Sequence, residues 1–163
     1  MNRSFWTWLA DMSSSVSLPL DGGFLRRECS RCEHQFKWHH GPTAERPEDT
    51  VDPRLYYCPY CGEPSPVDDW WTQEQIEYIQ QSALGPMMHE LADGFQRSLG
   101  SQRNSLIQIS LEFDEPEPPS SLVEPQDMTE IQSPCHPWEP IKIYDSWTSS
   151  LYCLLCGERF ALS

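Results

Sequence analysis

Positive charge is scarce in this chain. Its 163 residues include 11 Lys and Arg against 25 Asp and Glu, which gives a formal net charge of −14 at pH 7. A phosphate backbone repels such a surface, because nucleic-acid binding draws most of its free energy from clustered Lys and Arg that release counterions. Only Arg26, Arg27 and Arg31 form a tight basic group. The composition therefore argues against direct nucleic-acid binding and leaves only a small local basic patch.

Long hydrophobic runs are also missing. Asp11 and a serine run interrupt the aromatic N-terminus before it reaches the length of a signal-peptide core. No stretch has the roughly 20 apolar residues that a membrane-spanning helix needs. Hydrophobic residues make up 38% of the chain and prolines number 15, so we expect no large conventional core. These absences predict a protein without a membrane span, and we expect it to be cytoplasmic.

Catalytic motifs are a third absence. The sequence has no Gly-rich phosphate loop, nucleophile elbow or paired-carboxylate pattern. Its nearest approach is His89-Glu-Leu-Ala-Asp93, in which Asp93 stands where the zinc-protease motif needs a second histidine. A solvated helix face is the better interpretation of that segment. We therefore expect a protein that is not an enzyme.

Cysteine, by contrast, is abundant and regularly spaced. Seven cysteines cannot be used up by a closed set of disulfides. Two Cys-x-x-Cys pairs, Cys29/Cys32 and Cys58/Cys61, are a specific signal for one four-thiolate metal site. Four thiolates saturate tetrahedral zinc and leave no position for a substrate water. The sequence predicts a structural zinc site here, although iron would fit the same ligands.

A second, less regular cluster lies near the C-terminus. Residues 152–158 repeat the Tyr-Cys-x-x-Cys-Gly-Glu pattern of residues 57–63, and so supply Cys153 and Cys156. Cys135 adds a third thiolate, and the fourth ligand is His136, another histidine or water. A water ligand would make an open metalloenzyme site, but the deaminase pattern also needs a His-x-Glu that this chain lacks. We expect a closed three-Cys, one-His site, and hence two zinc ions per chain.

The two Cys-x-x-Cys-Gly turns resemble the knuckles of the zinc-ribbon and rubredoxin class. The resemblance covers residues 24–68 and 128–163, and it makes the second unit a degraded copy of the first. That class includes transcription factors, ribosomal proteins, polymerase subunits and small adaptors. The resemblance therefore implies a fold element and no specific function.

The segment between the two cysteine clusters has a helical pattern. Thr72 and Gln75 fit a capping box at its start, and Gly85-Pro86 should divide it into two helices. Alternating apolar residues then predict a strand over 106–113. We expect an α+β fold in which two small zinc-ribbon β units flank a helical segment. Its expected segments are an aromatic arm and linker over 1–23, zinc ribbon 1 over 24–68, the helical segment over 69–104, a strand and acidic proline-rich loop over 105–127, and zinc ribbon 2 over 128–163.

Two groups of residues indicate how such a scaffold would act. Phe5, Trp6 and Trp8 lie within four positions; they are either part of a floppy N-terminal tail or, as suits so large an aromatic cluster, buried on the body or in a partner. Glu115 and Glu117 lie in a stretch without Lys or Arg, which is either a solvated loop or an acidic limb for a basic partner.

These features favour a non-enzymatic adaptor that presents acidic and aromatic surface to a protein partner. An alternative is a nucleic-acid-associated ribbon protein. It would use Arg26, Arg27, Arg31, Lys37 and Trp38.

Overall fold

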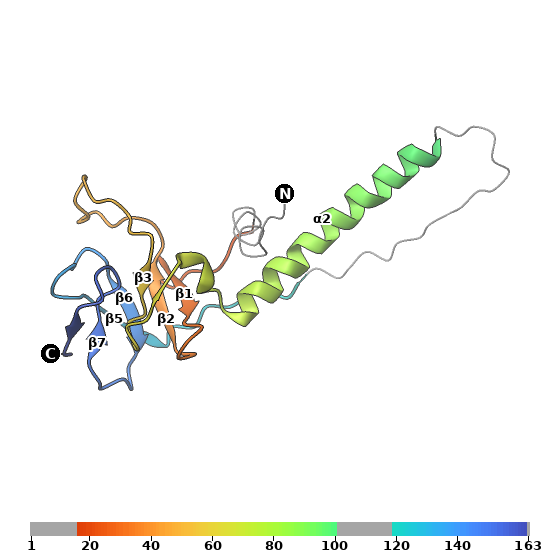
Figure 1. Cartoon of the computed structure of the whole chain (residues 1–163). Helices are drawn as coiled ribbons and strands as arrows, with labels where there is room; N and C mark the ends of the chain where they lie inside the picture. The colour runs from red at the N-terminus through yellow and green to blue at the C-terminus, as the bar shows by residue number, and fades with distance from the viewer. Residues whose placement is uncertain (1–15, 101–118, 163) are drawn as a thin grey trace.

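The structure is a computed structural model that describes residues 16–100 and 119–162 (Figure 1). It combines small antiparallel sheets with a single described α-helix, so the α+β class is confirmed. In chain order the elements are β1 (Phe24–Glu28), β2 (Gln35–His39), β3 (Tyr56–Tyr57), β4 (Pro64–Ser65), the 3-10 helix η1 (Val67–Asp69), α2 (Gln73–Gly100), β5 (Met128–Ile131), β6 (Ile141–Tyr144), β7 (Leu151–Tyr152) and β8 (Arg159–Phe160).

One antiparallel sheet joins the two cysteine-containing halves of the chain. Its strand order is β1-β2-β6-β5, and the central pairing places Lys37 opposite Lys142 and Trp38 opposite Ile141. The hairpins β3-β4 and β7-β8 form separate two-stranded sheets. The two units flank the helical segment in sequence, as expected, but they do not flank it in space. In space they pack on each other, and α2 extends to one side of them (Figure 1).

The hydrophobic core lies between one face of this sheet and the two hairpins. Phe36 and Trp70 are fully buried and meet edge to face, with ring centroids 5.3 Å apart. Both halves of the chain contribute to the same buried cluster, which contains Cys29, Phe36, Tyr56, Cys58, Tyr60, Trp70, Ile141, Ile143, Leu151 and Leu154. The two halves therefore share one core.

Helix α2 begins as the sequence predicts. The Gln75 backbone N–H donates to Thr72 Oγ1 at 3.2 Å, and the Thr72 N–H donates to Gln75 Oε1 at 3.1 Å, so the capping box is confirmed. Ile79 and Ala83, in its first turns, are buried, whereas Leu91 further along is 61% exposed. The helix leads away from the sheets (Figure 1).

The predicted division of this helix is wrong. α2 runs without interruption for 28 residues through Gly85-Pro86. Pro86 lacks a backbone N–H, so the helix loses one hydrogen bond there, but a proline inside a helix can kink it without ending it. The helix therefore continues through Pro86, although a proline in the sequence often marks the boundary of a helix.

Several sequence predictions lie outside the described residues. They are the strand over 106–113, most of the acidic proline-rich loop, the aromatic cluster Phe5, Trp6 and Trp8, and the acidic pair Glu115 and Glu117. Among the described residues, no helix has both the length and the apolar character needed to cross a membrane.

Candidate metal centres

Site 1 is built from two turns on different hairpins. Cys29 and Cys32 lie between β1 and β2, and Cys58 and Cys61 lie between β3 and β4. The four sulfur atoms all lie within 4.8 Å of one another, with Cys29 to Cys61 and Cys32 to Cys58 each at 3.7 Å. Tetrahedral zinc with Zn–S bonds of about 2.3 Å needs sulfurs about 3.8 Å apart. The donor set therefore fits such an ion, as the sequence predicts.

Site 2 has the same arrangement in the second half of the chain. Cys135 and His136 lie between β5 and β6, and Cys153 and Cys156 lie between β7 and β8. Their ligand atoms also lie within 4.8 Å of one another. Cys135 Sγ is 3.5 Å from Cys156 Sγ, and His136 Nδ1 is 3.2 Å from Cys153 Sγ. Of the possible fourth ligands, the structure therefore brings His136 to the three thiols.

The turns that carry the second cysteine pairs are alike in detail. The Gly62 N–H donates to the Cys58 carbonyl at 2.9 Å, and the Gly157 N–H donates to the Cys153 carbonyl at 2.8 Å. The two glycines have φ of 73° and 72°, in the left-handed region that side chains disfavour. This is the physical reason for the glycine in both Cys-x-x-Cys-Gly motifs.

The two sites differ in exposure. Cys29 and Cys58 are buried in site 1, whereas only Cys153 is buried in site 2 and both Cys135 and Cys156 are exposed. Both clusters can hold a metal ion, and zinc is consistent with either set of ligands.

Ser133 is a part of site 2 that the sequence did not reveal. It is buried, its hydroxyl donates to Cys153 Sγ at 3.3 Å, and the same oxygen accepts from the His136 N–H at 3.2 Å. Burial alone would raise the pKa of Cys153, but hydrogen bonds, first that of Ser133, lower that pKa to about 7. The only indication of this role in the sequence is the spacing. Ser133 and His136 are three residues apart, as are Cys29 and Cys32 of site 1.

Three of the other thiols are protonated at neutral pH when no ion is bound. Burial raises the pKa of Cys32 to about 11 and that of Cys135 to about 12. Burial also raises the pKa of Cys58 above its usual range. A metal binds thiolates, so binding at either site must release protons.

The knuckles of the two sites interlock. The Tyr57 N–H donates to the Leu154 carbonyl, and the Tyr152 N–H donates to the Pro59 carbonyl, both at 2.8 Å. Leu154 and Pro59 each directly follow the first cysteine of their own pair, so the two contacts are equivalent by sequence.

Each of the two tyrosines also covers the glycine of the opposite knuckle. A Cβ atom on Gly62 would lie 2.8 Å from Tyr152 Cδ1, and one on Gly157 would lie 2.7 Å from Tyr57 Cδ1. The tyrosine and glycine of each motif thus complete a reciprocal contact that links the two sites.

The opposite face of the sheet carries a row of cations. Arg26, Lys37 and Lys142 are neighbours across β1, β2 and β6. Lys37, which is fully buried, lies 2.8 Å from Asp21, 2.9 Å from Glu124 and 3.0 Å from Asp127.

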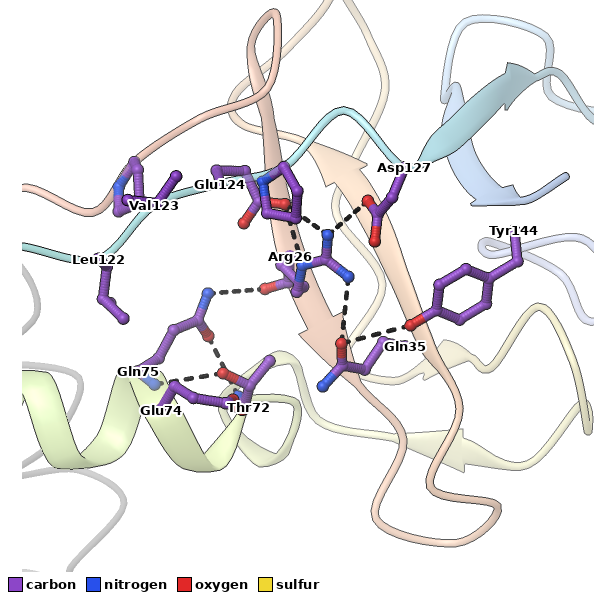
Figure 2. Close-up of a pocket in the computed structure, with 12 residues that line it drawn as sticks. Arg26, Gln35, Thr72, Glu74, Gln75, Leu122, Val123, Glu124, Asp127 and Tyr144 are labelled. Atoms are coloured by element: carbon purple, nitrogen blue, oxygen red, sulfur yellow. Dashed lines mark hydrogen bonds and ion pairs between the residues drawn. The ribbon is translucent and has the colours of Figure 1, made fainter.

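The Arg26 guanidinium is held between two of these carboxylates. It lies 2.8 Å from Glu124 and 2.6 Å from Asp127, beside a hollow of about 330 Å³ (Figure 2). Glu124 and Asp127 are therefore counterions of Arg26 and Lys37 within the fold.

Comparison with known proteins assigns no family to the chain. No protein-family model, no curated protein and no solved structure matches it. The likeness to zinc ribbons thus rests on the two cysteine clusters and their turns.

Proposed function

We propose that this chain is a non-enzymatic, cytoplasmic zinc-binding adaptor of the zinc-ribbon type, which presents acidic and aromatic surface to a protein partner. The observation that carries the proposal is that each cluster has four ligand atoms within 4.8 Å. Four protein ligands saturate tetrahedral zinc, as in structural sites, whereas catalytic sites keep one position for water or substrate. Two such ions would stabilise the small shared core, since each structural zinc contributes roughly 10–16 kcal/mol in small peptides.

The engagement of the basic residues supports a protein partner over a nucleic acid. Arg26 and Lys37 are buried beside Glu124 and Asp127. Trp38 donates its ring N–H to Glu139 at 2.5 Å. These side chains are therefore not free to contact a phosphate backbone, which needs accessible Lys and Arg.

The interaction is tested by affinity capture with the full chain as bait. Two variants of equal length, Trp6→Ala/Trp8→Ala and Glu115→Gln/Glu117→Gln, address the aromatic and acidic surfaces, and Val51→Ala at an 86% exposed position serves as control. A captured protein is then purified and its affinity for each bait is measured by calorimetry. We expect a loss of at least tenfold for one double variant with an unchanged thermal midpoint. Equal affinity for all baits would reject the proposed surfaces.

Nucleic-acid binding is measured separately by fluorescence anisotropy with duplex DNA. We expect no binding tighter than the non-specific range of roughly 10⁻⁴ to 10⁻⁶ M at physiological salt. Submicromolar binding that weakens with salt and is abolished by Arg31→Gln would replace the adaptor proposal.

A further inference from the structure

Two thiols of site 2 differ from the other cysteines in their access to solvent. Cys135 and Cys156 are exposed, whereas each of the other five cysteines is buried or partly buried. The sulfurs of the exposed pair lie 3.5 Å apart. The equivalent pair of site 1, Cys29 and Cys61, is also close, at 3.7 Å, but Cys29 is only 3% exposed. Access rather than distance therefore distinguishes the two sites, and a reagent in solution can reach both partners of a pair only in site 2.

The other two ligands of site 2 are protected from oxidation. Cys153 is 1% exposed, and its sulfur accepts a hydrogen bond from the Ser133 hydroxyl at 3.3 Å. His136 is an imidazole and cannot form a disulfide. Three disulfides are possible among the thiols of this site, and the bond between Cys135 and Cys156 is the one that leaves the buried sulfur untouched.

Two neighbouring exposed thiols can be oxidised by hydrogen peroxide in two steps. A bound metal keeps both sulfurs as thiolates, which are the nucleophilic form of cysteine. The first thiolate attacks a peroxide oxygen, the O–O bond breaks, hydroxide leaves and a sulfenic acid forms. The second thiolate attacks that sulfur, the S–S bond forms and a second hydroxide leaves. The two sulfurs together lose two electrons, and the peroxide gains them.

We propose that Cys135 and Cys156 are a modification site for hydrogen peroxide and form a disulfide with each other. A disulfide is about 2 Å long, so the two sulfurs must approach by about 1.5 Å, which exposed side chains achieve by rotation. Cys153 and His136 then remain as ligands, whereas structural zinc needs four.

The consequence of the disulfide is release of the metal ion from site 2. Thiol exchange reverses a disulfide, and in a reducing compartment such bonds are usually transient. The modification would therefore be reversible in the cytoplasm. The inference concerns the thiols alone and does not depend on the adaptor function.

The site is tested on the zinc-loaded full chain with hydrogen peroxide and a chromogenic chelator that reports free zinc. Differential alkylation and mass spectrometry identify the oxidised cysteines. We expect the first zinc ion to leave together with a disulfide between Cys135 and Cys156, and reductant with added zinc to reverse both changes. A first disulfide that contains Cys153 or any cysteine of site 1 would overturn the proposal. So would irreversible oxidation to sulfinic acid, or zinc that stays bound at a peroxide concentration that oxidises free cysteine.

Cys135→His provides a variant that cannot form this disulfide. Imidazole replaces a thiolate, so four zinc ligands remain. We expect peroxide to release zinc from it about tenfold more slowly than from the wild type, or slower still. Cys32→His is the control, because it gives site 1 the three-Cys, one-His donor set of site 2 and keeps the exposed pair. Its first zinc ion should leave at the wild-type rate.

Elemental analysis establishes whether each variant still holds about two zinc ions per chain. If both variants hold them and release zinc at equal rates, the proposal is wrong. If Cys135→His does not hold two ions, the disulfide found in the wild type decides the question, since the mapping needs no variant.

Discussion

At the scale of single residues, a backbone position with positive φ in each Cys-x-x-Cys turn explains why glycine stands at Gly62 and Gly157. Gly62 and Gly157 each stand four residues after the first cysteine of their turn, and Glu33 stands four residues after Cys29. Glu33 also has φ of 59°, and its N–H donates to the Cys29 carbonyl at 2.8 Å. The first turn therefore has the same knuckle geometry without glycine, and it carries the strain that the other two avoid.

Exchanging residue types at these positions should change stability in opposite directions. Glu33→Gly should raise the free energy of unfolding by up to about 1–2 kcal/mol, because glycine accepts positive φ. Gly157→Ala should lower it by at least that amount, since its new methyl group would also meet the Tyr57 ring. Urea unfolding of the zinc-loaded protein measures both changes. Gly94→Ala is the control, because nothing lies within 4 Å of a Cβ there and alanine favours the helix.

The buried ion pairs set the response to acid. Hydrogen bonds from Lys37 and Lys142 lower the pKa of Asp21 below 3.8. A carboxyl group with a lowered folded-state pKa stabilises the protein above its unfolded pKa, and this contribution disappears as pH falls through the folded pKa. Asp21→Asn should therefore cost about 1–3 kcal/mol at pH 7, with a difference from wild type that shrinks below about pH 4.

The difference between the two proteins is the useful measurement, because metal binding also weakens in acid. Unfolding by urea at several pH values supplies it, and Asp49→Asn at an exposed loop position is the control. A difference between Asp21→Asn and wild type that is independent of pH would contradict the assigned ion pairs.

At the scale of elements, Gln75 connects the start of α2 to the sheet. Its side chain accepts from the Thr72 N–H and also donates to the Arg26 carbonyl at 3.0 Å (Figure 2). Gln75→Ala removes both bonds from a buried position and should lower stability by about 1–3 kcal/mol. Gln73→Ala, which removes an exposed contact with Glu77, should change it little. Thermal unfolding compares the two, and equal losses would contradict the role of Gln75.

The features that the sequence predicts correctly are those determined by residues close together in the sequence. The capping box needs only Thr72 and Gln75, and the cysteine pairs that come together are spaced within their own turns. The pairing of β2 with β6 joins residues about a hundred positions apart, so no local pattern could specify it. The ion pairs of Arg26 with Glu124 and Asp127 also join distant residues, and a sequence shows charges without their partners.

At the scale of the whole molecule, the two halves of the chain are arranged symmetrically. The strand order β1-β2-β6-β5 reads the same from each half, and each half adds a hairpin that completes its cysteine cluster. The hairpins contact each other through equivalent hydrogen bonds. The turn that carries each cysteine pair is therefore stabilised by contacts with the turn of the other site. We expect the loss of one metal ion to weaken binding of the other.

This coupling predicts the behaviour of a single cysteine variant. Wild-type protein should contain about two zinc ions per chain by elemental analysis and release both over one range of chelator concentration. Cys58→Ser breaks site 1, and it should also weaken site 2 because the β3-β4 knuckle no longer supports Tyr152. Zinc should then fall well below one per chain at a chelator concentration that leaves the wild type loaded. A Cys58→Ser protein that keeps one zinc ion with wild-type resistance to chelator would show that the sites are independent, and the reciprocal tyrosine contacts would then serve packing alone.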